Sequence, residues 1–181
     1  MTATTNAKHS SKTAEHYTPA KYVEAAREVL GGIDLDPASC AIANETVKAT
    51  EFYTKDDDGL SIRWFGNIFC NPPGGKVANK SLPKLFWNKL VKDTQEGFVD
   101  HAIFLAFSIE ALQTCQKDVL AAMGNFALCI PDHRISFVDA TGKPLGGNTH
   151  ASAFVYIPGR VSRKTDFIYT FSQFGVILNK R

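Results

Sequence analysis

Asn71-Pro72-Pro73 is the segment whose residue types point most directly to chemistry. Two consecutive prolines stiffen the chain and leave the neighbouring carbonyl oxygens free to accept hydrogen bonds. The side-chain oxygen of Asn71 beside a rigid carbonyl can accept both hydrogens of one planar amino group. The segment therefore predicts a site that recognises an amino group such as that of adenine, cytosine or glutamine. The alternative interpretation is a tight turn, since Asn and Pro dominate turns for backbone reasons.

Two accepted hydrogen bonds have a consequence for the amino nitrogen itself. Its lone pair is normally delocalised, and holding both N–H bonds in acceptors favours a tetrahedral nitrogen that can attack a methyl sulfonium. No strong base is needed, because the attacked nitrogen becomes acidic once it gains the methyl group. We therefore expect catalysis by positioning and by oriented acceptors that face a developing positive charge.

Two apolar runs position the polar residues. Residues 67–70 lead into Asn71, and residues 33–36 end in Asp36-Pro37, followed by the small residues Ala38 and Ser39. In open α/β sheets, ligands bind outside the carboxyl ends of the strands. We therefore expect both segments at one edge of a sheet. Asp36-Pro37 could also be a simple strand terminator.

The remaining pattern predicts a mixed, mainly parallel sheet flanked by helices, with antiparallel strands near the C-terminus. Thr18 is expected to cap a helix that begins at Pro19 and ends at Gly31-Gly32. The other expected elements are a turn at 56–60, a helix opening at Ser81 or Pro83, a buried strand at 101–107, a helix from Ser108 to about Ala122, and strands at 126–130, 135–138, 153–157 and 167–178.

The composition limits the class of protein and the number of domains. The chain has 181 residues, 44% hydrophobic and 21% charged, with a net charge of +2, which fits one soluble domain over residues 14–181 after a disordered polar tail at 1–13. No apolar run approaches the ~20 residues of a membrane span, so we expect a cytoplasmic protein. The four cysteines, Cys40, Cys70, Cys115 and Cys129, show no metal-ligand spacing, and three of them lie in or beside apolar runs, which predicts reduced thiols in the core and no metal centre.

At this point the sequence resembles the phage-type DNA N-6-adenine methyltransferases, a group of S-adenosylmethionine-dependent amino-methyltransferases. The resemblance covers most of residues 16–158 and consists of motifs in order. They are Tyr17-Thr18-Pro19 before the first helix, Ile33-Asp34-Leu35-Asp36-Pro37-Ala38-Ser39 as cofactor strand and turn, Phe52-Tyr53-Thr54 and Asp57-Asp58-Gly59-Leu60 with Trp64, the catalytic loop Asn71-Pro72-Pro73, and, more weakly, Arg134-Ile135-Ser136-Phe137.

The resemblance implies a Rossmann-like methyltransferase fold, S-adenosylmethionine as methyl donor, and an adenine flipped out of DNA as acceptor. By the family pattern, the Asn71 side chain and the Pro72 carbonyl hold the amino group, with Pro73 completing the loop. The cofactor would lie among Tyr17, Thr18, Pro19, Asp36, Pro37, Ala38 and Ser39, with either Asp57 or Asp58 as a polar contact. Asp57 and Asp58 could equally be part of a solvated acidic turn. A phage or prophage origin in a bacterial host is a further implication.

The chain departs from the family pattern in two places. Gly74 stands where most amino-methyltransferases have an aromatic residue that stacks on the base, and Ala38-Ser39-Cys40-Ala41 replaces the glycine-rich cofactor turn. The stacking ring would then come from Phe69, Phe86, Trp87 or Phe137, although Phe86 and Trp87 also fit a helix core.

Basic residues in the second half could bind DNA phosphates or form a solvated face. These residues are Arg134, Lys143, Arg160, Arg163 and Lys164. The scattered histidines His101, His133 and His150 receive no catalytic role.

Other functions remain open on the sequence. The same loop could serve methylation of cytosine or of a protein glutamine, and a catalytically inactive DNA-binding or partner-binding module could retain the fold. The sequence leaves both monomer and homodimer possible.

Overall fold

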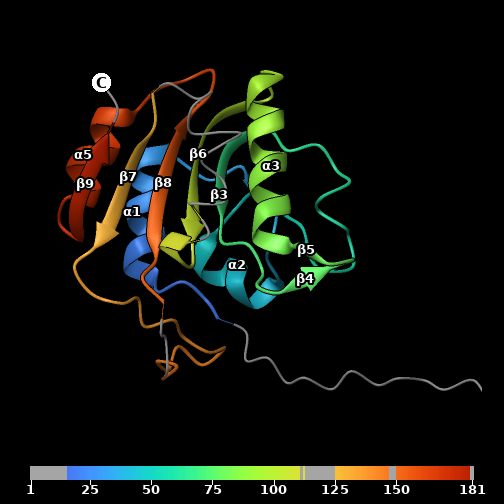
Figure 1. Ribbon diagram of the computed structural model, residues 1–181, viewed down its shortest axis with the longest axis horizontal. Coiled ribbons are helices and arrows are strands. Elements are labelled where there is room, and N and C mark those ends of the chain that lie inside the picture. Colours follow the sequence, from blue (N-terminus) through green and yellow to red (C-terminus); the bar gives the residue numbers. More distant parts are fainter. Residues whose placement is uncertain (1–15, 111, 113–124, 147–149, 180–181) are drawn as a thin grey trace, which may run out of the picture.

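A computed structural model of the protein describes residues 16–110, 112, 125–146 and 150–179. These residues form an α/β fold around one seven-stranded sheet with the strand order β2-β1-β3-β6-β8-β7-β9 (Figure 1). The elements are α1 (Ala20–Leu30), β1 (Leu35–Asp36), α2 (Ala41–Val47), β2 (Glu51–Phe52), β3 (Gly66–Cys70), β4 (Lys76–Val77), β5 (Lys80–Ser81), α3 (Leu82–Gln95), β6 (Val99–Ala106), β7 (Ala127–Pro131), β8 (Ala153–Pro158), α5 (Lys164–Phe171) and β9 (Gly175–Asn179).

The sheet is mixed, as the sequence predicts. β1 is parallel to both β2 and β3, and β3 is parallel to β6. β8 pairs antiparallel with both β6 and β7, and β9 pairs antiparallel with β7. The carboxyl ends of β1, β3, β6 and β7 therefore lie at one edge of the sheet, which we call the carboxyl edge. Their amino ends lie at the opposite edge, the amino edge.

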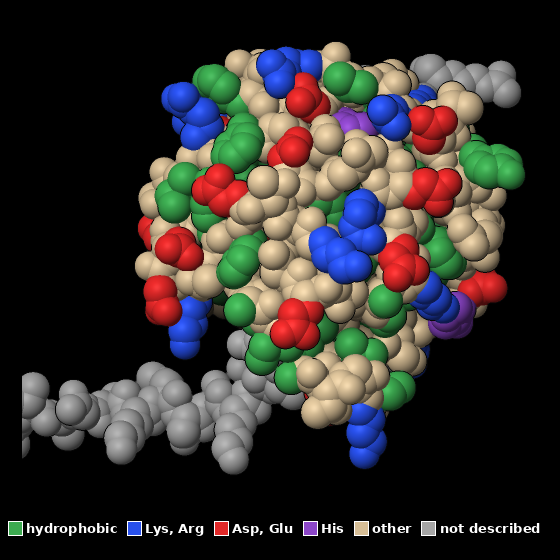
Figure 2. Space-filling view, turned by 180° about the vertical axis from the view of Figure 1, so that it is seen from behind, with side chains coloured by type: hydrophobic (Ala, Val, Ile, Leu, Met, Phe, Trp, Pro, Cys, Tyr) green, Lys and Arg blue, Asp and Glu red, His purple; other side chains and the backbone are tan. Residues whose placement is uncertain are grey.

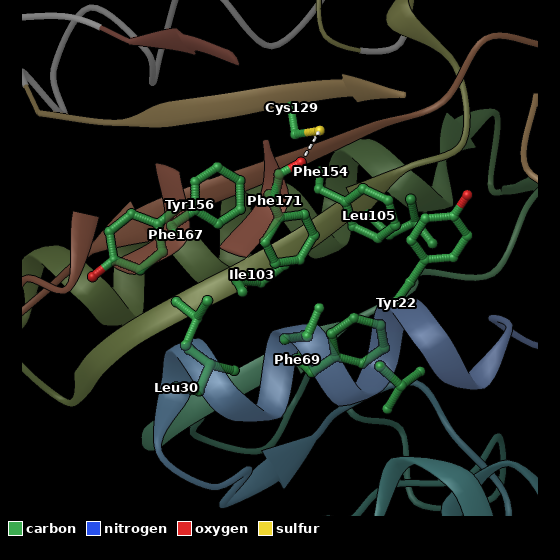
Figure 3. Packing of buried hydrophobic residues seen from close by; sticks show 14 of the residues in the cluster. Tyr22, Leu30, Phe69, Ile103, Leu105, Cys129, Phe154, Tyr156, Phe167 and Phe171 are labelled. Carbon is green, nitrogen blue, oxygen red and sulfur yellow. Dashed lines mark hydrogen bonds between the residues drawn. The ribbon is translucent and has the colours of Figure 1, made fainter. Parts of the chain in front are cut away.

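Both faces of the sheet are covered, which explains the continuous apolar run in β6. Ile103 and Leu105 point into the core under α1 and α5, and Phe104 points into the core under α3. Figure 3 shows the first of these cores, where Tyr22 and Leu30 of α1 and Phe171 of α5 pack over the same face of the sheet. A strand buried on both faces needs apolar residues at every position, rather than at every second one.

Helix α1 forms largely as predicted, but its N-terminal cap differs from the prediction. Its buried positions follow a helical stripe, and Gly31 adopts the left-handed φ of 71° that closes the helix through N–H bonds to the last turn. The expected cap at Thr18 is wrong: the cap residue is Pro19, and no side chain caps the helix. The Thr18 hydroxyl accepts instead from Asn71, 53 residues away.

Two strand predictions are wrong. Residues 135–138 are irregular, and Val138 makes only isolated bridges to Tyr17 and Pro144. Residues 167–178 contain the end of α5 and then β9. Phe167, Thr170 and Phe171 are buried at helical spacing, so their aromatic and β-branched composition suggested a strand where the burial period is that of a helix.

Several expectations fall partly or wholly outside the described residues. Residues 109–110 are helical, and the Ser108 hydroxyl accepts from the Glu110 N–H as a cap should, but the rest of that predicted helix, the tail 1–13 and Cys115 are not described. Cys70 and Cys129 are buried, as predicted. The described helices include none with the length and apolar character that crossing a bilayer requires.

Candidate functional site

The predicted polar segments meet at the carboxyl edge. β1 has β2 on one side and β3 on the other, so the chain reverses its direction of progress through the sheet between β1 and β3. Such a switch point leaves a crevice outside the strand ends, where α/β proteins bind ligands. Asp36 is the last residue of β1 and Asn71 follows the last residue of β3.

The side chain of Asn71 is held in one orientation. Its Nδ2 donates to the Thr18 Oγ1 at 3.2 Å and to the His16 carbonyl at 3.3 Å. Both contacts use the amide N–H groups, so the Oδ1 is the end of the amide turned away from these partners. Asn71 therefore offers an acceptor at the end of β3, the property that its sequence context predicts.

The segment that holds Asn71 is itself tied to the rest of this edge. Tyr17 exchanges two backbone hydrogen bonds with Val138, at 2.9 and 3.0 Å, and its hydroxyl lies 3.6 Å from the Cys40 Sγ. The ring of Phe137 packs at 5.9 Å from that of His16. Four segments far apart in sequence, 16–19, 36–40, 71–73 and 137–138, thus converge beside Asn71.

Asp36 is a buried carboxyl group. It is 3% exposed, and burial raises its pKa to about 7, although a hydrogen bond from the Ala38 N–H at 3.2 Å acts in the opposite direction. The nearby Ser39 hydroxyl favours the ionised carboxylate, yet it is itself buried without a hydrogen bond of acceptable geometry. Among the described residues, no lysine or arginine forms an ion pair with Asp36. This carboxyl group thus lacks a cation to balance its charge.

The acidic turn lies against the Asp36 segment. A Cβ on Gly59 would meet the Pro37 carbonyl oxygen at 2.5 Å, so only glycine permits this approach. Asp57 and Asp58 are exposed in the same turn, and the Asp57 carboxylate accepts from the Thr54 N–H and hydroxyl at 2.8 and 2.7 Å, which lowers its pKa. Asp57 therefore stabilises the turn.

The residues predicted to bind the base do not share one surface, because Gly74 is exposed and the aromatic residues are buried. Gly74 is exposed, with open space where a side chain would be. Phe86 and Trp87 are 6% and 0% exposed in the core under α3, where Trp87 packs edge-to-face on Phe104. We correct their assignment from substrate binding to core packing, because neither ring reaches a ligand surface. Phe69 and Phe137 are also buried, at 1% and 7%.

The basic residues do not form one surface. Arg134 and Lys143 are exposed in the loop after β7, at the carboxyl edge. Arg160 pairs with Asp100 at 2.7 Å, and Lys164 bonds Asn125, both at the amino edge. On the α1 side of the molecule, Lys and Arg alternate with Asp and Glu rather than gathering in a patch (Figure 2). Only part of the predicted set is therefore near the site.

Sequence reasoning missed one feature of this edge, a pocket where β6 ends. About 300 Å³ lie between the start of α3 and the end of β6, with Phe107 and His150 among the lining residues. The signal was present, since Phe107 directly follows a buried strand as Asn71 does. It was overlooked because the apolar run gives no sign of where the strand ends.

The described residues contain no group of three or more His, Cys, Asp or Glu side chains placed to hold a metal ion. Comparison with family models, curated proteins and solved structures finds no match to the chain.

Proposed function

We propose that the protein is an S-adenosylmethionine-dependent amino-methyltransferase whose acceptor is the exocyclic amino group of adenine in DNA. The observation that carries the proposal is the orientation of Asn71. Hydrogen bonds to Thr18 and His16 hold its Nδ2 and turn its Oδ1 outward at the end of β3. An amide held in this way accepts from an amino group without first reorganising.

The topology is consistent with a Rossmann-like methyltransferase fold. The segments that resemble the family's cofactor turn and catalytic loop lie on the two strands that flank the switch point. That is where the general rule for open α/β sheets places a ligand and its reacting partner.

The residues of the crevice also fit a cationic cofactor. S-adenosylmethionine carries a sulfonium and an ammonium group, and Asp36 is a buried carboxyl group that no lysine or arginine of the described residues pairs with. A positive ligand would favour the ionised carboxylate and so offset its desolvation. The proposal assigns Asp36 and Ser39 to polar contacts, Tyr17, Thr18, Pro19, Pro37 and Ala38 to the walls, and Asp57 or Asp58 to a further contact at the rim.

When bound, the cofactor supplies an electrophilic methyl group. The chain's own contribution is to hold the acceptor: the Asn71 Oδ1 and the Pro72 carbonyl each accept one N–H of the amino group. These oxygens favour a lone pair directed at the methyl carbon and stabilise the positive charge that grows on the nitrogen. The nitrogen then releases one proton to water, which restores a neutral amine.

The test is nucleoside mass spectrometry on unmethylated DNA incubated with the purified protein and S-adenosylmethionine. We expect N-6-methyladenine from the wild type and a loss of about 10²–10³-fold for Asn71→Ala, the range seen when one preorganised hydrogen bond to a developing charge is removed. Asn88→Ala, on the exposed side of α3, is the matched control and should keep full activity.

Other outcomes lead to other functions. N-4-methylcytosine or methylated glutamine in place of methyladenine would keep the chemistry and change the acceptor. A folded protein that neither methylates nor binds S-adenosylmethionine in calorimetry would refute the proposal in favour of an inactive binding module.

A further inference from the structure

The two outer strands of the sheet, β2 and β9, differ in how their free edges are protected. β2 is two residues long and begins with the charged Glu51. β9 is five residues long, Gly175–Asn179, and contains neither a charged residue nor a proline. It lies at the outer edge of the sheet (Figure 1), and no strand in the described part of the chain pairs with its free side. Edge strands usually carry a charge, a proline or a bulge that prevents pairing with another strand, so β9 is open to such pairing.

Every second residue of β9 directs its backbone groups away from the sheet. The Asp132 N–H donates to the Phe174 carbonyl at 2.9 Å, directly before the strand. Backbone groups alternate in direction along an antiparallel strand, so the groups of the odd-numbered residues face outward. These residues are Gly175, Ile177 and Asn179.

Apolar side chains accompany this open edge. Val176 and Leu178 are 56% and 49% exposed. They lie opposite Ile130 and Leu128 of β7, so the four aliphatic side chains share one face of the two outer strands. Ile177 packs on the other face, against the core under α1 and α5. A further strand along the edge would cover the exposed parts of Val176 and Leu178.

A second copy of the same strand fits this edge. Antiparallel pairing of two identical strands is two-fold symmetric, as a closed dimer requires. In the register that overlaps the whole strand, Ile177 lies opposite the partner's Ile177, and Gly175 lies opposite the partner's Asn179. All three outward residues then pair their backbone groups. Val176 lies opposite the partner's Leu178, so aliphatic side chains meet on both sides of the axis.

The charges at the two ends of β9 favour the same partner. After Asn179 the chain continues with Lys180 and Arg181. At the other end of the strand, the Asp132 side chain is 72% exposed beside its contact with His133. Antiparallel pairing brings the basic end of each copy beside the acidic end of the other, so opposite charges meet at both ends of the interface.

We infer that β9 is a dimerisation surface whose partner is β9 of a second copy, which continues the sheet across a two-fold axis at Ile177. β7, β8 and β6 separate β9 from β3, so the dimer leaves the crevice at β1 and β3 open, and the inference does not depend on the proposed reaction. One short strand pair makes a small interface, so we expect a dissociation constant of the order of micromolar.

Sedimentation equilibrium of the full chain, from about 1 to about 300 µM, brackets that affinity. Leu178→Lys should raise the dissociation constant of the dimer at least about tenfold, because the axis repeats each change on both copies. Tyr169→Lys is the matched control and should dimerise as the wild type does. It places the same charge on an 81% exposed aromatic on the side of α5 next to α1.

Disulfide formation tests the register. Val176 and the partner's Leu178 would form a pair without hydrogen bonds, with Cα atoms about 4.5 Å apart, which a disulfide can span. A mixture of Val176→Cys and Leu178→Cys proteins should therefore crosslink under mild oxidation with copper phenanthroline. Either variant alone should crosslink no more than the wild type, because identical positions lie diagonally, about 7–8 Å apart.

Three results would overturn the inference. The first is a wild type that stays monomeric over this concentration range. The second is a dimer as tight in Leu178→Lys as in the wild type, which would have to use another surface. The third is a mixture that crosslinks no more than the single variants, which would exclude this register. The crosslinking decides the matter if urea denaturation shows that Leu178→Lys does not fold.

Discussion

The two edges of the sheet hold buried titratable groups in opposite ways. At the amino edge, His101 is 1% exposed and bonded on both sides, by the Leu30 carbonyl and the Tyr156 hydroxyl at 3.2 Å each. The Tyr156 hydroxyl accepts from the Arg163 N–H, so it donates to the His101 Nδ1, and the Nε2–H donates to Leu30. At the carboxyl edge, Asp36 is 3% exposed, accepts one backbone hydrogen bond, and has no lysine or arginine partner in the described part of the chain.

The difference separates structural burial from burial that fits a ligand. Burial lowers the pKa of His101, which keeps the ring neutral and its two hydrogen bonds intact. Burial raises the pKa of Asp36 to about 7, so the folded protein loses stability by keeping this carboxylate ionised at neutral pH. Groups that lower stability in this way are concentrated at binding sites. Five variants and a pH titration of the wild type test whether the two edges differ as this comparison requires.

The largest effect should come from Asp36→Asn. Because the pKa of Asp36 is higher in the folded than in the unfolded protein, its stability contribution is fully present below about pH 4 and is lost as the pH rises through 7. Above pH 7 the variant should therefore have a free energy of unfolding up to about 4 kcal/mol higher than the wild type, measured by urea denaturation. It should also bind S-adenosylmethionine more weakly. Asp34→Asn, just before β1, is the control. Unchanged cofactor affinity would remove Asp36 from the site.

The raised pKa of Asp36 also predicts that the affinity of the wild type for S-adenosylmethionine depends on pH. A bound cation favours ionised Asp36, so affinity for S-adenosylmethionine should rise with pH and level off above about 7. Calorimetry between pH 5.5 and 8.5 measures it, and Asp36→Asn should flatten the curve.

His101→Leu should have the opposite effects to Asp36→Asn: it should lower stability and leave cofactor affinity unchanged. It leaves the Leu30 carbonyl and Tyr156 hydroxyl without a buried partner, so we expect a loss of about 1–3 kcal/mol of unfolding free energy at pH 8. Cofactor affinity should not change. Because the pKa of His101 is lowered on folding, the wild type loses stability as the pH falls below 6.5, and the variant should lose less. Weaker cofactor binding would contradict the separation of the two edges.

Thr18→Val should reduce the rate of methyl transfer about tenfold, because the variant leaves Asn71 with only the His16 carbonyl to orient it. One lost hydrogen bond of about 1.4 kcal/mol gives this factor. Thr18→Ser keeps the hydroxyl and should restore the rate. A rise in KM alone, with kcat unchanged, would argue against an orienting role.

The smallest effect is expected at Arg160. Its ion pair with Asp100 is largely exposed, so Arg160→Ala should change stability by no more than about 1 kcal/mol and leave DNA affinity unchanged. Arg134→Ala, at the carboxyl edge, should weaken DNA binding at low salt and reduce its salt dependence. If Arg160→Ala and Arg134→Ala weakened DNA binding equally, the two edges would not differ in DNA binding.

Much of the site was predictable because it depends on local sequence and one topological rule. Asp36 and Asn71 each end an apolar run, and parallel strands bring such ends together. The role of Thr18 was not predictable, since a hydroxyl before a proline suggests a helix cap and the contact with Asn71 spans 53 residues. The helix at Lys164–Phe171 was missed because its composition is typical of strands, while its burial period depends on contacts with α1.

The sequence by itself determined that β6 is buried on both faces, that α1 ends at Gly31, and that an Asn-Pro-Pro loop follows β3. Each of these follows from the steric and burial demands of a few neighbouring residues. Only the tertiary structure decided that Asp36 has no lysine or arginine partner among the described residues, that Phe86 and Trp87 face the core, and that Thr18 bonds Asn71. Packing brings together segments far apart in the chain, so burial and electrostatic environment are properties of the whole fold.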